Sequence, residues 1–234
     1  RDPAAVLVHH HLRLKQQYFF VSASLQDMLG RFKQRNLPWS ELPNCMAIQL
    51  NDTHPSIAIP ELMRLLLDHE GLAWEEAWDI TRQTFAYTNH TVLPEALERW
   101  PVDLMTNLLP RHMELIYQIN ERFLESVRQQ HPKDLGLLAR ISLIEEGWQK
   151  QVRMPYLSII GSHTVNGVAA LHTELLTQTI FQDFYRMHPE RFQNKTNGIT
   201  PRLWLRCANP ELSTLICDHI GDKWITDLDE LRRL

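Results

Sequence analysis

The chain has 234 residues, 44% of them hydrophobic and 22% charged, so it can bury a sizeable core. Its formal net charge of −4 lacks the basic balance typical of nucleic-acid binding. Three cysteines, Cys45, Cys207 and Cys217, cannot all pair, which indicates reduced thiols and a cytoplasmic protein. No apolar run approaches the length of a membrane span, and the first residues lack a signal-peptide core, so we expect no membrane association.

Helices and short apolar strands alternate along the first part of the chain. Apolar residues recur at helical spacing from Leu12 to about Arg35, and a short buried strand is predicted at Met46–Leu50. Pro60, tolerated in a first turn, begins a helix that Gly71 stops. A helix over Trp74–Thr84 then leads into a second strand over Thr84–Tyr87.

The same alternation continues to the C-terminus. Pro101 and Pro110 each open a helix, the second extending to about Gln130. Further predictions are helices at 135–141, 210–220 and 228–234, a strand at 156–161, and a helix start within 165–172. Strands that alternate with helices predict an α/β fold with a parallel sheet flanked by helices.

Polar, turn-prone stretches follow two of the predicted strands, and a third lies near the C-terminus: Asn51–Pro55, Thr88–Glu98 and Asn194–Arg202. Ligand sites of open α/β sheets form where strands end, so these loops predict a crevice lined by Asp52, His54, His90 and Asn197. The residues alone name no reaction.

Three common site types are not supported by the sequence. The twelve histidines show no ligand spacing on a predicted helix, so we expect no metal site, and His9–His11 is interpreted as a solvated tail. Neither a Gly-x-Ser-x-Gly elbow nor a phosphate-binding Gly-x-x-x-x-Gly-Lys loop occurs, and Asn166-Gly167 is interpreted as a turn. Seven tryptophans are many for this length, but most tryptophans pack in cores rather than stack on sugars.

These loops and their intervals resemble the α-glucan (glycogen/maltodextrin) phosphorylases from about Leu12 to Leu234. The stretches that carry the resemblance are Ile48–Pro55, Ala86–Trp100, Leu108–His112, Ser162–Ala169 and Phe192–Arg202. The resemblance implies a middle fragment of a two-domain glycosyltransferase of the GT-B type. Residues 1–193 would be the later part of the N-terminal domain, and 194–234 the crossing and the start of the C-terminal domain.

The chemistry that the resemblance implies is phosphorolysis of α-1,4-glucans by inorganic phosphate, which gives glucose 1-phosphate. His90 falls on the family's active-site histidine, and Asn197 on the asparagine that contacts the same glucose near its 6-hydroxyl. Asp52 and His54 fall in the polar pocket beside the anomeric carbon, and Trp204 falls near the ring of the pyridoxal phosphate cofactor. The Schiff-base lysine of that cofactor is expected outside this chain.

A second, non-catalytic sugar surface is implied by Tyr117, Asn120, Glu146 and Lys150, which fall on the family's glycogen storage site. Tyr117 and Asn120 are about one helical turn apart, a spacing that suits a surface groove. Glu121 replaces a usual glutamine there, and Leu203 replaces a usual arginine near the domain junction.

Two interpretations remain at this stage: an inactive segment of an allosteric, homodimeric cytoplasmic enzyme, or a non-catalytic α-glucan-binding or scaffold module. The abrupt ends at Arg1 and Leu234 favour the segment, and a reading frame that continues past Leu234 would support it.

Overall fold

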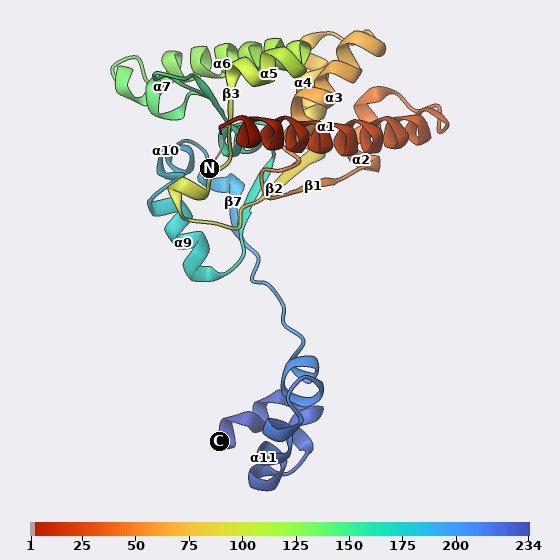
Figure 1. Cartoon of the computed structure of the whole chain (residues 1–234). Helices are drawn as coiled ribbons and strands as arrows, with labels where there is room; N and C mark the ends of the chain where they lie inside the picture. The colour runs from red at the N-terminus through yellow and green to blue at the C-terminus, as the bar shows by residue number, and fades with distance from the viewer. Residues whose placement is uncertain (1–2) are drawn as a thin grey trace. The chain divides into compact units, whose positions relative to one another are not determined.

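The computed structural model describes residues 3–234 and divides into two compact units, the first extending to Thr196 and the second covering Asn197–Leu234 (Figure 1). The α-helices of the first unit are α1 (Pro3–Lys33), α2 (Leu42–Cys45), α3 (Ala58–Arg64), α4 (Trp74–Thr84), α5 (Val102–Leu108), α6 (Pro110–Gln130), α7 (Leu135–Ile141), α8 (Met154–Ile160), α9 (Ala170–Gln178) and α10 (Gln182–Met187). Short 3-10 turns are η1 (Trp39–Glu41), η3 (Pro94–Ala96) and η4 (Pro189–Arg191), and α3 continues into a π-helical turn, η2 (Leu65–His69).

A four-stranded parallel sheet organises the first unit. Its strands lie in the order β1 (Ile48–Asn51), β2 (Phe85–Thr88), β6 (Thr164–Gly167) and β7 (Phe192–Asn194), and every neighbouring pair is parallel. Leu50, Tyr87 and Val165 lie in register on adjacent strands and are fully buried, as expected when helices cover both faces of a sheet. The predicted α/β class and the first two predicted strands are confirmed.

A second, antiparallel sheet has the order β3 (Arg99–Pro101), β5 (Gln151–Arg153) and β4 (Ile144–Glu145), and the sequence patterns did not predict it. These strands are two or three residues long, too short to show a period of two.

The predicted strand over Tyr156–Gly161 is wrong, because Met154–Ile160 forms helix α8 with Pro155 in its first turn. Leu157, Ile159 and Ile160 are all buried, and an apolar run that is buried on every side has no period that separates a helix from a strand. The predicted helix start within 165–172 is also shifted, since 164–167 form strand β6 and α9 begins only at Ala170.

Most predicted helices are confirmed with small changes in their limits. Helix α1 starts nine residues earlier than the predicted Leu12 and contains His9–His11, so these histidines are not a bare tail. The His10 ring meets Trp100 edge-on, with the ring centroids 5.9 Å apart. Gly71 ends the α3–η2 helix with a φ of 71°, as its position predicted.

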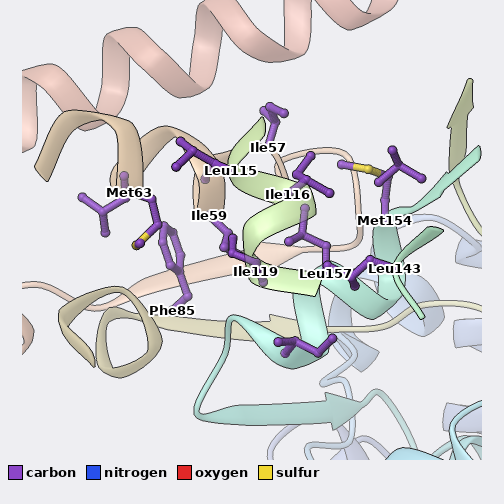
Figure 2. Packing of buried hydrophobic residues seen from close by; sticks show 14 of the residues in the cluster. Ile57, Ile59, Met63, Phe85, Leu115, Ile116, Ile119, Leu143, Met154 and Leu157 are labelled. Carbon is purple, nitrogen blue, oxygen red and sulfur yellow. The ribbon is translucent and has the colours of Figure 1, made fainter. Parts of the chain in front are cut away.

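The hydrophobic core of the first unit lies where α3, α6 and α8 meet the parallel sheet (Figure 2). Helix α3 packs against both α1 and α6, and α8 packs against β2. Gly161, directly after α8, lets Ile59 approach so closely that a β-carbon would lie 2.8 Å from its Cγ2 atom.

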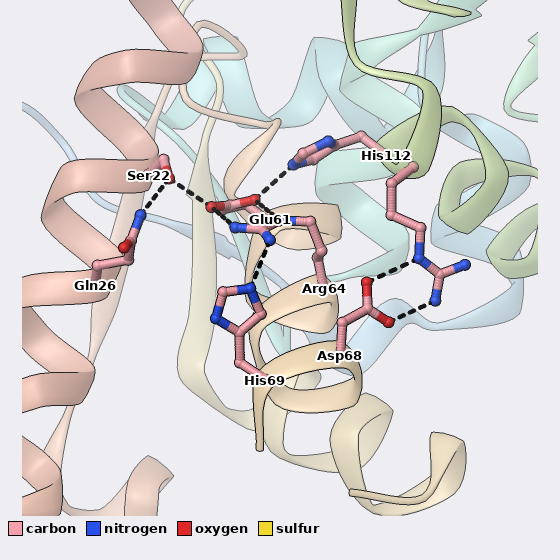
Figure 3. A network of polar contacts seen from close by, with 8 residues as sticks. Ser22, Gln26, Glu61, Arg64, Asp68, His69 and His112 are labelled. Atoms are coloured by element: carbon pink, nitrogen blue, oxygen red, sulfur yellow. Dashed lines mark hydrogen bonds and ion pairs between the residues drawn. The ribbon is translucent and has the colours of Figure 1, made fainter. Parts of the chain in front are cut away.

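A buried carboxylate joins the three helices α1, α3 and α6 (Figure 3). Glu61 of α3 is fully buried and accepts hydrogen bonds from Ser22 of α1 at 2.6 Å and from the Arg64 guanidinium at 2.8 Å. Its Oε2 lies 2.6 Å from Nε2 of His112 on α6. Burial alone would raise the pKa of Glu61, but the hydrogen bonds from Arg64, His112 and Ser22 prevail and lower it to about 2.

The second unit has a small core of its own. Its elements are a π-helical turn η5 (Arg202–Cys207), helix α11 (Pro210–Ile220) and the 3-10 turns η6 (Lys223–Ile225) and η7 (Leu228–Arg233). Ile216, Ile220 and Trp224 are buried together, and Gly221 ends α11 with a φ of 79°. Helix 210–220 is therefore confirmed, whereas the predicted helix 228–234 is a 3-10 turn.

Candidate functional site at the carboxyl edge of the sheet

The strands β1, β2, β6 and β7 all end at one edge of the sheet, because they are parallel. Asn51 ends β1, Thr88 ends β2, Gly167 ends β6 and Asn194 ends β7. The loops that begin with Asp52 and with Asn89 therefore emerge side by side, as the sequence predicted for a ligand crevice.

Asp52 holds a left-handed backbone conformation directly after β1, with a φ of 64°. This region is sparsely used by residues other than glycine, although aspartate tolerates it better than most. Its amide donates to the Thr88 carbonyl at 2.9 Å, and its carboxylate accepts from the Thr53 amide at 2.7 Å. The turn thus ends the β1–β2 ladder and fixes the direction of the loop that carries His54.

His90 follows β2 and contacts the end of β1 through its ring. Its Nε2 atom lies 2.6 Å from Oδ1 of Asn51. Because an amide oxygen only accepts, Nε2 carries the proton, and the ring is held in one orientation at the exposed edge.

A row of hydrogen bonds runs across the strands β1, β2 and β6 near this edge. Gln49 donates to the Thr88 hydroxyl at 2.9 Å, and Thr88 donates to Oδ1 of Asn166 at 2.8 Å. Asn89 is fully buried. Its main-chain amide donates to the main-chain carbonyl of Asn166 at 2.9 Å, and its side-chain Oδ1 accepts from the main-chain amide of Thr91 at 3.0 Å. These contacts fix the start of the His90 loop.

Asn166 and Gly167 lie in β6 and not in the turn that the sequence predicted. Gly167 has no positive φ; it is needed because α9 passes so closely that a β-carbon would lie 2.9 Å from Cα of Thr173. The Asn-Gly pair has the composition of a turn but serves close packing here.

His172 at the start of α9 is a site residue that the sequence analysis missed. Its Nδ1 accepts from the Val168 amide at 3.0 Å, whereas its Nε2 is buried without a hydrogen-bond partner within the described residues. Burial lowers the pKa of His172, and the neighbouring His90 lowers it further. The sequence feature that could have identified it is a histidine in the first turn of the helix that follows β6.

A polar cavity of about 360 Å³ extends from the Asp52 loop toward β3. Asp52, His54 and Glu95 line it, and so do Glu98 and Arg13, which pair at 3.4 Å. The structure therefore brings Asp52 and His54 to one cavity. His90 does not line this cavity; its ring contacts Asn51, the residue before Asp52. This arrangement can bind a neutral polyhydroxylated ligand through many donors and acceptors.

Asn197 and Trp204 belong to the second unit. Asn197 is exposed in the segment before η5, and Trp204 lies within η5 with 62% of its surface exposed.

The predicted storage-site residues lie on α6 and on the turn between β4 and β5. Tyr117 is exposed, and Glu146 and Lys150 form an exposed ion pair at 3.0 Å. The hydrogen bond with Glu146 raises the pKa of Lys150. Trp148, between Glu146 and Lys150, is fully exposed and was missed.

Asn120 is turned away from that surface, with only 8% of its area exposed. Its Oδ1 accepts from the Leu143 amide at 2.8 Å, and its amide group donates to the Ser142 hydroxyl at 3.2 Å. The expected shared groove of Tyr117 and Asn120 is therefore not formed, because the Asn120 side chain joins α6 to the start of β4.

Two further properties bear on ligands. No group of three or more histidine, cysteine or acidic residues among the described residues could hold a metal ion. No helix in the described part of the chain is long and apolar enough to span a membrane.

The fold is that of an α/β protein whose parallel strands end in polar loops, the place where ligand sites of such folds form. A family model described as carbohydrate phosphorylase matches residues 5–234. The muscle form of glycogen phosphorylase from Bos taurus is 57% identical over 231 residues, covering 95% of this chain and 27% of the relative. A glycogen phosphorylase from Synechocystis is 56% identical over 223 residues, again 95% of this chain and 26% of the relative.

The chain belongs to the carbohydrate phosphorylase family. It spans about a quarter of the length of these relatives.

Proposed function

We propose that this chain forms one wall of the glucose site of an α-glucan phosphorylase, which uses inorganic phosphate to release glucose 1-phosphate from α-1,4-glucans. The observation that carries the proposal is the pairing of the Asp52 and His90 loops at the carboxyl edge of the sheet, with the His90 ring fixed by Asn51.

His90 would contact the reacting glucose through its ring and its main-chain carbonyl, and the carbonyl would stabilise an oxocarbenium-like transition state. Asp52 and His54, which line the polar cavity, would hold water and hydroxyl groups beside the anomeric carbon. For Asn197 we propose a hydrogen bond to the 6-hydroxyl of a glucose unit, the role that the family resemblance implies.

Pyridoxal phosphate, which the family resemblance implies, needs a lysine for its Schiff base, and such lysines are typically desolvated. The side chains of the chain's lysines are all exposed: Lys15, Lys33, Lys133, Lys150, Lys195 and Lys223. None of these lysines has the desolvated surroundings that a Schiff-base lysine needs, so we assign no residue of this chain to the covalent attachment of the cofactor. Exposed Trp204 would pack near a cofactor ring held by residues elsewhere in the protein.

The test is phosphorolysis of maltoheptaose by the intact protein and its His90→Ala variant. Loss of the contacts to the transition state should lower kcat/KM roughly 100-fold. His163→Ala is the matched control, because His163 is also exposed but precedes β6 at the opposite edge of the sheet. Equal losses in both variants, or none in His90→Ala, would contradict the proposal.

The isolated chain should release no glucose 1-phosphate, since it carries no anchor for the cofactor. Phosphate-dependent release by the pure chain would refute this. In the cell we place the intact protein in the cytoplasm as a homodimer under allosteric control.

An α-glucan-binding role without catalysis is the second candidate, and the exposed aromatic pair Tyr117 and Trp148 favours it. If the same surface serves as a storage site in the intact enzyme, Tyr117→Ala should weaken its binding of polysaccharide and leave its activity on short oligosaccharides unchanged. An equal loss on both substrates would rule out a separate storage surface.

A further inference from the structure

A second cavity lies at the edge of the parallel sheet opposite the glucose site. It has a volume of about 290 Å³, and its walls come from α4, α6, α8, α10 and η4. Arg82, Ile160 and Arg191 line it, and each lies shortly before the start of a strand: β2, β6 and β7, respectively. Because the strands are parallel, these positions share the amino edge of the sheet.

Positive charge exceeds negative charge in the cavity, because Glu75, which also lines it, is paired with Arg122. Arg82, His188 and Arg191 line it together, and Nε of Arg82 is buried without a hydrogen-bond partner in the part of the chain that is described. Within residues 3–234, neither Arg82 nor Arg191 has a carboxylate at ion-pair distance. His188 has one weak partner, Glu190, at 3.5 Å.

Arg82, His188 and Arg191 line the same cavity, so the charge of each disfavours the charged forms of the others. Burial lowers the pKa of Arg191, and the charge of Arg82 lowers it further. Burial also lowers the pKa of His188, with Arg191 and Arg82 acting in the same direction. Like charges that line one cavity repel, so an anion bound between them would stabilise the folded chain.

Aromatic and aliphatic groups form the rest of the wall. Trp78, Phe123 and Phe184 line the cavity, and the Arg122 guanidinium lies 4.6 Å from the ring centre of Trp74, above its face. Arg122 is also paired with Glu75, so its charge is already balanced. A ligand that fits must therefore combine a strong anion with an apolar or flat part.

We propose that this cavity binds a small phosphate monoester, whose phosphate group pairs with Arg82 and Arg191 and whose organic part lies against the aromatic wall. Guanidinium groups bind phosphate oxygens in pairs, which suits unpartnered arginines, and the volume matches a small ligand. This site is independent of the glucan chemistry at the carboxyl edge.

Phenyl phosphate, titrated calorimetrically into the full chain, is the direct probe. We expect saturable binding that is tighter than the binding of inorganic phosphate and absent for phenol. Arg82→Gln and Arg191→Gln should each weaken binding roughly tenfold, as loss of a charged hydrogen bond does. Arg128→Gln is the control, because Arg128 lies on α6 but pairs with Glu125 and does not line the cavity.

Two further measurements keep the test decisive. Hydrogen exchange of the unmodified chain should slow in Trp74–Thr84 and Gln182–Arg191 when phenyl phosphate binds. Without ligand, Arg82→Gln should melt at the same or a higher temperature, since it relieves repulsion. Binding that is equal in the control and both glutamine variants, protection confined to other segments, or no saturable binding to a cooperatively melting chain would overturn the proposal.

Discussion

Nε2 of His90 lies 2.6 Å from Oδ1 of Asn51, so the second residue after β2 is held by the last residue of β1. Both side chains are exposed, so the contact contributes little to folding. Its consequence is chemical: it fixes the protonated nitrogen and leaves Nδ1 and the main-chain carbonyl of His90 available to a ligand.

Asn51→Ala should therefore lower the activity of the intact phosphorylase without unfolding it. Loss of one hydrogen bond that orients a reacting group corresponds to about 1.4 kcal/mol, or roughly a tenfold drop in kcat/KM. The measurement is glucose 1-phosphate release from maltoheptaose, with Asn44→Ala as the control at an exposed asparagine outside the site. Unchanged activity of Asn51→Ala would show that the contact does not position His90.

Gly167→Ala tests the close approach of α9 to β6. The added methyl group would lie 2.8 Å from Nδ1 of His172 and 2.9 Å from Cα of Thr173. A backbone atom cannot move aside without displacing helix α9. We expect a loss of about 1–3 kcal/mol in the free energy of unfolding, measured by urea denaturation. Gly30→Ala in α1 is the control: nothing lies within 4 Å of its β-carbon, so the helix should gain about 0.5–1 kcal/mol. Equal effects of the two variants would contradict this interpretation.

The patterns that predicted the fold correctly were those with a physical period or a stop signal. The long stripe of α1 had the first, and the helix ended by Gly71 had the second. The strands predicted at 46–50 and 84–87 were short apolar runs between helical patterns, and the structure has them at 48–51 and 85–88. The buried run in α8 had neither, because contacts on every side remove the period, and tertiary packing decided its conformation.

The candidate site was predicted in part for the same reason. Polar residues that follow strands predicted the Asp52 and His90 loops, because strand ends converge in a parallel sheet. Asn89, Asn166 and His172 were missed, since their surroundings depend on distant segments: Asn89 donates to the Asn166 carbonyl, and the charge of His90 acts on His172. Trp148 was one tryptophan among seven, and only its exposure distinguishes it.

The buried carboxylate of Glu61 should make the free energy of unfolding depend on pH. Its pKa falls from an ordinary 4.5 to about 2 in the folded chain, so its contribution is complete above pH 4.5 and is lost as the pH falls toward 2. That contribution is roughly 3 kcal/mol. The unfolding free energy of the unmodified chain should decline over this interval more steeply than that of Glu61→Gln.

The same variant should already be less stable at pH 7 by about 3 kcal/mol, because it leaves Arg64 and His112 without their charged partner. Glu114→Gln is the control, since Glu114 is exposed on α6 beside Arg111. Parallel pH profiles for the unmodified chain and Glu61→Gln would show that the network does not lower the carboxyl pKa.

Trp148 predicts a sugar-binding contact that can be separated from catalysis. Its indole is fully exposed in the turn that carries the Glu146–Lys150 ion pair, and Tyr117 is exposed on α6. The flat face of an exposed tryptophan stacks on the apolar face of a glucosyl ring, a contact of about 1 kcal/mol. Trp148→Ala should therefore weaken calorimetric binding of maltoheptaose roughly fivefold and leave the melting temperature unchanged. Phe19→Ala, an equally conspicuous exposed aromatic on α1, should change neither quantity. If both variants bind the sugar as tightly as the unmodified chain, the turn between β4 and β5 is not a glucan surface.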